Sequence, residues 1–346
     1  MEKPGRQLVR AAVTTWTVCI VMGVLSMPVP AFKTGELEAT TPEEAAYAVL
    51  DELTQSAVCN LSSLDTELDH LRKENYFKAE CVGGKFFLKL ANEPIAKRFL
   101  PVMQRVKDWP LLSDSILLPI AEFSFWRVLY HPDFPIKVFY GVYPWIEGPT
   151  LGSLLYNMRP SRVEDVERLK DIYRQLGTLL GTLHSAGLLE PGLPVQQLYS
   201  RLAHNDLHRH NLIVTPEKGL VILDIDSFSP PEQPRSVANT FVANAVRLLF
   251  LHAHDAGFFK GSPFGAVWVA VQPYAALELF TSYCQTLMGE DKAMPCVFAL
   301  IEHMTGKREL CDDWRSSPWA EQTELMLPVD KEEALRRLKN AFALRR

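Results

Sequence analysis

The segment from His204 to Asp226 combines polar side chains at fixed spacings with two short apolar runs. The runs, Asn211–Val214 and Leu220–Leu223, flank the turn-forming segment Pro216–Gly219, so they are predicted to pair as a β-hairpin. In an antiparallel hairpin, the start of the first strand lies beside the end of the second. Polar residues at these two ends can therefore direct their side chains to one place.

Three side chains of this segment suit the transfer of a phosphoryl group. The reaction needs a carboxylate that orients or deprotonates the attacking hydroxyl, and oxygen ligands for Mg²⁺ near the phosphates. Asp206 would be that carboxylate, and Asn211 with Asp224 would bind the metal. Asp226, two positions further on, is either a second metal contact or a turn cap.

The loop His204–Asn211 resembles the catalytic loop of the protein-kinase-like superfamily, whose pattern is His-x-Asp-x-x-x-x-Asn with a metal-binding aspartate after the following hairpin. The pair Leu207-His208 is similar to the aminoglycoside phosphotransferase and choline kinase branch. The triplet Asp224-Ile225-Asp226 resembles that of the lipopolysaccharide-core (Kdo) sugar kinases. The resemblance implies ATP and Mg²⁺ as cofactors, and it implies that His208 lies near the γ-phosphate and balances its charge.

Earlier segments fall where this superfamily places its nucleotide contacts. Lys89 lies in the second strand of a predicted hairpin, Tyr76–Cys81 with Lys85–Leu90. By the resemblance, its ammonium group would bind the α- and β-phosphates. Val142 and Tyr143 open a segment that resembles the hinge of small-molecule kinases, where the backbone would hydrogen-bond adenine.

Two features of the superfamily have no plain counterpart in this sequence. No glycine-rich phosphate loop precedes Tyr76, so Arg72 or Lys73 would have to replace its donors. The glutamate that should pair with the lysine is not placed either, because Glu93 comes very early and Gln104 is not acidic. A catalytically inactive, kinase-like binding module therefore stays open as an alternative.

The wider pattern predicts an α+β, two-lobed protein-kinase-like fold, with a small β-rich N-lobe over residues 33–142 and a larger, mainly helical C-lobe over residues 143–346. An acidic, polar linker is expected around Lys33–Glu44, before the N-lobe strands. The remaining elements follow from apolar periodicity. They are a helix within Ala91–Trp109, strands at Ile116–Phe123 and Lys137–Tyr143, a long helix from Ser161 to Gly187, and a core helix at Phe264–Phe280.

The charge balance limits the partners. The net charge of −5 provides no positive field that would attract nucleic acid, so no nucleic-acid partner is expected. The Leu207-His208 pair and the Asp-x-Asp ending favour the hydroxyl of a small molecule or glycan as acceptor. A protein Ser/Thr or Tyr substrate is the alternative.

Residues 1–32 have the pattern of a signal peptide or an N-terminal membrane anchor. Lys3, Arg6 and Arg10 precede an uncharged run, Ala11–Phe32, which ends in Val29-Pro30-Ala31. An exported or membrane-anchored protein is favoured over a cytoplasmic one. The other interpretation is an N-terminal helix that packs on the domain, or a short anchor at the membrane surface.

The cysteines do not decide the compartment. No two of them have the spacing of a zinc or redox site, so small buried side chains are the expected role. In an exported protein, Cys59 with Cys81 or Cys284 with Cys296 would be the candidate disulfides. Asn60-Leu61-Ser62 forms a glycosylation sequon, a pattern that also arises by chance.

Overall fold

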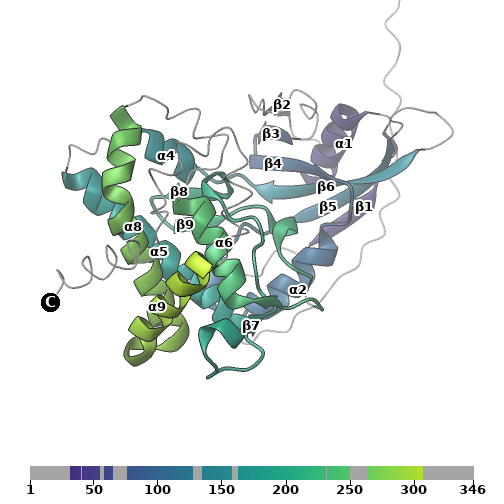
Figure 1. The fold of residues 1–346 in the computed structure, drawn as a ribbon. Coiled ribbons are helices and arrows are strands. Elements are labelled where there is room, and N and C mark those ends of the chain that lie inside the picture. Colours follow the sequence, from purple (N-terminus) through teal and green to yellow (C-terminus); the bar gives the residue numbers. More distant parts are fainter. Residues whose placement is uncertain are drawn as a thin grey trace, which may run out of the picture. The chain divides into compact units, whose positions relative to one another are not determined.

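The computed structural model (Figure 1) describes residues 32–39, 41–54, 58–64, 76–127, 135–157, 163–230, 232–249 and 263–306. The chain divides into two compact units. The first comprises Met1–Leu100 with Leu117–Ile146, and the second comprises Pro101–Ile116 with Glu147–Arg346. Apart from Phe32, the expected leader lies outside the described residues, as do Arg72 and Lys73.

The first unit is built on a six-stranded sheet with the order β1-β5-β6-β4-β3-β2. β1 pairs with β5 in parallel, and every other pair is antiparallel. The strands are β1 (Lys33–Glu36), β2 (Cys59–Ser63), β3 (Tyr76–Cys81), β4 (Gly84–Ala91), β5 (Ala121–Arg127) and β6 (Ile136–Pro144).

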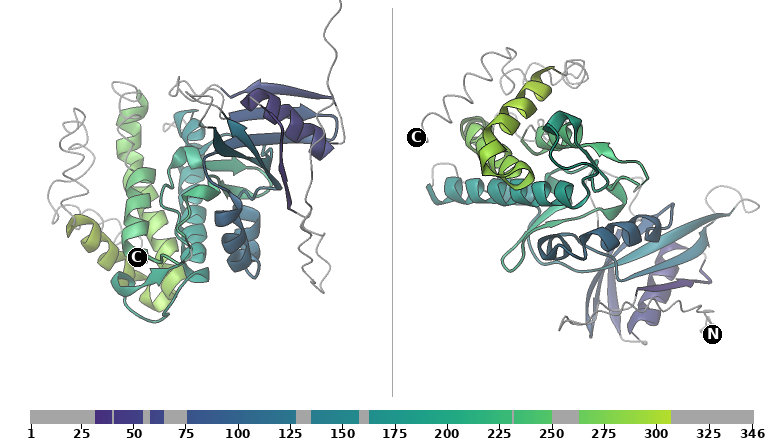
Figure 2. Two further views of the ribbon diagram at one scale, coloured as in Figure 1. Left: turned by 90° about the vertical axis from the view of Figure 1, so that its right-hand side faces the viewer. Right: turned by 90° about the horizontal axis from the view of Figure 1, so that it is seen from below.

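Helix α1 (Pro42–Thr54) packs against one face of this sheet (Figure 2). Ala45, Ala46 and Val49 form a buried stripe that meets sheet residues such as Leu88. The start of the helix is a capping box around Thr41, whose Oγ1 accepts a hydrogen bond from the Glu44 amide at 3.2 Å. An acidic, polar linker was expected over Lys33–Glu44. That prediction was wrong, since the structure has β1 and the first turn of α1 in this range; acidic residues dominate the local composition around the apolar stripe.

The hairpin that carries Lys89 is confirmed, with β3 and β4 joined at Val82-Gly83. The following helix, α2, covers Ala96–Val106, inside the range expected for it. The strand expected at Ile116–Phe123 begins only at residue 121, because Pro119 has no amide hydrogen to donate to a neighbouring strand.

The second unit is mainly helical and carries two small antiparallel strand pairs. The most extensive packing contact between its helices is that of α5 with α8, which lie side by side. Its helices are α3 (Pro110–Ser115), α4 (Leu151–Asn157), α5 (Val163–Ala186), α6 (Val237–Leu249), α8 (Pro263–Met288) and α9 (Glu290–Gly306). Its strands are β7 (Tyr199–Ser200), which pairs with β10 (Arg235–Ser236), and β8 (Leu212–Thr215), which pairs with β9 (Gly219–Ile222).

The α5–α8 contact requires glycine on α5. A β-carbon at Gly181 would lie 2.9 Å from the Tyr283 carbonyl oxygen, and one at Gly177 would collide with the backbone of α8. An ion pair from Arg174 Nε to the buried Glu278 carboxylate, 3.0 Å long, joins the same two helices. The long α5 helix and the helical character of Phe264–Phe280 are thus confirmed. Among the helices that the structure describes, none has the length and apolarity to span a bilayer.

Two disulfides link the four cysteines of the described residues. Cys59–Cys81 joins register partners on β2 and β3, with 4.1 Å between the Cα atoms. Cys284–Cys296 joins α8 to α9, with 5.8 Å between the Cα atoms. Both candidate pairs are therefore confirmed, and the expectation of unpaired buried cysteines was wrong for these four residues.

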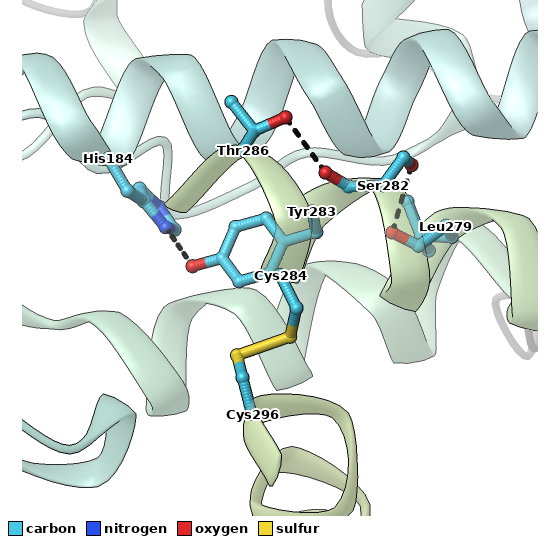
Figure 3. Close-up of a disulfide and its surroundings, with 7 residues drawn as sticks. All are labelled: His184, Leu279, Ser282, Tyr283, Cys284, Thr286 and Cys296. Atoms are coloured by element: carbon cyan, nitrogen blue, oxygen red, sulfur yellow. Dashed lines mark hydrogen bonds between the residues drawn. A yellow bond between two sulfur atoms is a disulfide. The ribbon is translucent and has the colours of Figure 1, made fainter. Parts of the chain in front are cut away.

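A buried histidine lies beside the second disulfide (Figure 3). His184, on α5, has no exposed surface, and its Nδ1 lies 2.7 Å from the hydroxyl of Tyr283. Tyr283 precedes the disulfide-bonded Cys284. Burial lowers the pKa of His184 from 6.5 to about 4, because the charged imidazolium would lose its hydration.

This depressed pKa predicts that acid destabilises the fold. The unfolded chain takes up a proton at His184 below pH 6.5, whereas folded His184 stays neutral to about pH 4. His184 should therefore lower the free energy of unfolding by about 2 kcal/mol between pH 7 and pH 5. Urea unfolding of wild type and His184→Gln at both pH values measures this. An unchanged pH dependence in His184→Gln would contradict the assignment.

Candidate active site

The loop before β8 is held by a buried, neutral histidine. His204 Nε2 lies 3.1 Å from the Leu223 carbonyl, and its Nδ1 lies 3.3 Å from the Asp206 amide. A carbonyl only accepts and an amide only donates, so the proton is on Nε2 and the lone pair is on Nδ1. Burial lowers the pKa of His204 to about 4, in agreement with the neutral ring. His204 thus braces the loop through its contacts with the backbone.

Asn211 is fixed by the backbone of Asp206. Its Nδ2 donates to the Asp206 carbonyl at 2.9 Å, which leaves Oδ1 as the atom that can accept a hydrogen bond or bind a metal. Asn211 is the last residue of the short 3₁₀ turn η2 (Arg209–Asn211), directly before β8. Its carbonyl accepts the Leu223 amide at 2.8 Å, so the start and the end of the hairpin lie side by side as predicted.

Asp224 has a left-handed backbone conformation, with φ of 63° and ψ of 60°. The other described residues with a positive φ are all glycines. Such a conformation is uncommon outside glycine and tends to occur at functional sites. The Ser227 hydroxyl donates to Asp224 Oδ2, and Asp226 lies in the intervening turn η3 (Ile225–Ser227). This strained turn sets the direction of the Asp224 carboxylate.

His208 lies close to Asp206. Its Nε2 is 3.8 Å from Asp206 Oδ2, too long for a hydrogen bond but short enough for attraction when the ring is charged. Its Nδ1 accepts the His210 amide at 3.2 Å, which orients the ring. Both residues were predicted from the sequence, and the structure brings their side chains together.

Two residues of α6 also contact this loop, and the sequence patterns did not identify them. Asn244 is fully buried; its Oδ1 accepts the Leu207 amide at 3.3 Å and its Nδ2 donates to the His204 carbonyl at 2.9 Å. Arg247 Nη1 lies 3.3 Å from Asp206 Oδ1 and also donates to the Asn205 carbonyl. Helix α6 therefore supports the backbone of the loop and one oxygen of the Asp206 carboxylate.

A hollow of about 370 Å³ lies next to Asn205 in the second unit. The side chains around it offer an aromatic ring, hydroxyl groups, amides and a guanidinium. They include Tyr199, Arg235, Ser236, Asn239 and Thr240.

In the first unit, Lys89 and Glu122 lie on the same face of the sheet. Lys89 is the register partner of Gly141 on β6, and Gly141 is in turn the partner of Glu122 on β5. Glu122 caps α2 by accepting the Ala96 amide at 2.9 Å, and burial raises the pKa of its carboxyl. Glu122, on β5, thus places a carboxylate beside the start of α2, whereas an acidic residue on the helix itself was expected.

Val142 and Tyr143 lie in the centre of the sheet. The Val142 carbonyl accepts the Ile120 amide at 2.7 Å, so it already has a donor within the sheet. The use of Val142 and Tyr143 for nucleotide binding stays a prediction.

The element order is the one expected from the sequence. A β-rich unit with a lysine-bearing hairpin comes first, and a mainly helical unit that carries the His204–Asn211 loop and the β8–β9 hairpin follows. The α+β fold class predicted from the sequence is confirmed.

No family model and no curated protein sequence matches the chain. WaaP in complex with acyl carrier protein is 12% identical, covering 79% of this chain and 98% of WaaP, with a TM-score of 0.42. A protein described as an aminoglycoside phosphotransferase from Ralstonia eutropha is 15% identical, covering 75% and 98% of the two chains, with a TM-score of 0.36. A divergent Toxoplasma kinase is 11% identical, covering 85% and 89%, with a TM-score of 0.35. Similarity at this level does not define an activity.

Asn244 supplies a test of how the loop is held. Replacing it by alanine leaves the Leu207 amide and the His204 carbonyl buried without these partners, so Asn244→Ala should lower the free energy of unfolding by about 1–3 kcal/mol. Gln196→Ala, an exposed change in the same unit, should cost at most about 0.5 kcal/mol. Urea unfolding compares the two. Equal effects would show that α6 does not hold the loop through Asn244.

Proposed function

We propose that the chain is an ATP- and Mg²⁺-dependent kinase that transfers the γ-phosphate to a hydroxyl group of a small molecule or glycan. One observation carries the proposal. The side-chain amide of Asn211 donates a hydrogen bond to the backbone carbonyl of Asp206, the residue that supplies the loop carboxylate. Asn211 also lies beside the end of the hairpin that leads into Asp224. This brings the two functions that phosphoryl transfer requires into one short segment.

The residues of this segment fit a magnesium ion. Asn211 uses its amide nitrogen internally, so its oxygen is left for a metal, and Asp224 adds a carboxylate. In the part of the chain that the structure describes, no three His, Cys, Asp or Glu side chains gather to hold a metal by themselves. Mg²⁺ commonly binds through one or two protein oxygens together with phosphate oxygens and water. Asp226 is the candidate for a further contact.

The proposed chemistry assigns a role to each side chain. Asp206 would orient the acceptor hydroxyl and take its proton as the oxygen bonds to the γ-phosphorus and the bond to the bridging oxygen of ADP breaks. Lys89 would bind the α- and β-phosphates. His208 would balance negative charge on the transferred group, since it lies 3.8 Å from Asp206. A bound Mg²⁺ would neutralise charge on the phosphates.

The lining of the hollow beside Asn205 supports a polyhydroxylated acceptor. Amides and hydroxyls hydrogen-bond sugar hydroxyls, and the half-exposed ring of Tyr199 offers a surface for stacking. Arg235 adds a positive charge, which suits an acceptor that already carries an acidic group. A protein hydroxyl is the alternative acceptor.

Transfer of labelled γ-phosphate from Mg-ATP to sugars, glycolipids and generic proteins tests the proposal. Asp206→Asn and Asp224→Asn should each lower the rate by a factor on the order of 10² or more, because one removes the base and the other a metal ligand. Lys89→Ala should also lose transfer. Asp108→Asn, an exposed change between α2 and α3, should leave it intact. Wild-type transfer by Asp206→Asn would refute the mechanism. No transfer and no thermal shift with Mg-ATP would favour an inactive binding module.

Arg247 should position the Asp206 carboxylate. Arg247→Ala removes the 3.3 Å ion pair, and kcat should fall roughly tenfold, or about 1.4 kcal/mol, with KM for ATP unchanged. Arg247→Lys should recover part of the loss, since an ammonium keeps the charge but not the planar geometry. Steady-state kinetics measure both variants. A rise in KM for the acceptor with unchanged kcat would mean that Arg247 binds the acceptor instead.

A further inference from the structure

The sequon Asn60-Leu61-Ser62 lies on β2, an outer strand of the six-stranded sheet. Side chains alternate along this strand. Leu61 packs against the core of the first unit, whereas Asn60 and Ser62 are exposed. The middle residue is not proline, so the segment meets the requirement for attachment of an N-linked glycan. The position of this sequon therefore leaves room for a glycan, which a sequon buried in a core would not.

The two disulfides give independent evidence on the compartment. The described cysteines all form bonds, and each unit contains one: Cys59–Cys81 in the first and Cys284–Cys296 in the second. Structural disulfides form in oxidising compartments and are rare in the reducing cytosol. Cys59 directly precedes the sequon, so one cysteine of the disulfide and the sequon lie on the same strand, β2.

We infer that this chain matures in an oxidising secretory lumen, where Asn60 carries an N-linked glycan. The co-reactant is an oligosaccharide bound to a lipid pyrophosphate. Asn60 Nδ2 forms a bond to the anomeric carbon, the bond from that carbon to the pyrophosphate oxygen breaks, the lipid pyrophosphate leaves, and the amide loses one proton. No redox change accompanies this step. The inference stands whether or not the chain transfers phosphate.

The surroundings of Asn60 suit a glycan. Its register partner on β3 is the exposed Glu80, which forms an ion pair with Lys78 at 2.7 Å, so this part of the sheet face is polar. The register partner of Glu80 on β4 is Lys85, which lies four residues before Lys89. Four residues of strand span about 13 Å, which separates the glycan from the proposed phosphate contact. A glycan at this position would also shield an outer strand from pairing with other chains.

The test is expression of the full chain, residues 1–346, in eukaryotic cells that glycosylate secretory proteins. The wild-type protein should migrate more slowly on a gel by the shift that one glycan causes, a single mobility step, and peptide-N-glycosidase should remove this step. Asn60→Gln and Ser62→Ala should both lack the step. Ser62→Thr is the matched control, because it changes the same residue but keeps the sequon, so it should retain the step.

Alkylation of free thiols in the same lysates reports the compartment separately. Cys59, Cys81, Cys284 and Cys296 should resist a thiol reagent until a reductant is added, and peptide mass spectrometry locates each label. Oxidised cysteines together with an unmodified Asn60 would refute glycosylation of Asn60. Reactive cysteines together with an unmodified Asn60 would also refute maturation in an oxidising compartment. A mobility step that persists in Asn60→Gln would place the modification elsewhere and also refute the inference.

Discussion

The site depends on one buried amide. Asn244 satisfies a backbone donor and a backbone acceptor of the His204–Leu207 turn, which would otherwise face a low-dielectric interior without partners. A buried polar group without a partner is costly, so the turn can take this path only where α6 supplies both bonds. His204 then ties the turn to Leu223, at the end of β9. The position of Asp206 relative to the hairpin follows from these two side chains.

The strained residue in this unit lies where the proposed chemistry needs it. Asp224 has a left-handed conformation that costs free energy for a residue with a β-carbon, on the order of 1 kcal/mol. The Ser227 hydroxyl, which bonds to the Asp224 carboxylate, helps to hold this turn. The surrounding structure therefore favours the direction of the side chain over the most relaxed backbone, as is common at ligand sites.

Local patterns allowed the loop, the β8–β9 hairpin and the lysine-bearing hairpin to be predicted, because each depends on residues close in sequence. Asn244 and Arg247 could not be predicted in this way. They act across about forty residues of chain, and their contact with the loop arises only when α6 packs. Glu122 was missed for a related reason: it reaches the start of α2 from a strand. The disulfides could be named as candidates, but their formation depends on cross-strand register and on the α8–α9 turn.

Both disulfides close short segments, 22 and 12 residues apart in sequence, and both lie within a single unit. Each bond can therefore form as soon as its own segment has emerged during synthesis, without waiting for the rest of the chain. Cys59–Cys81 would be complete before any of the second unit's long helices exist. Closing loops of this size restricts the unfolded chain by about 3 kcal/mol each. A nascent chain would thus acquire its covalent restraints in the order in which it is made, which limits the wrong pairings open to the cysteines that come later.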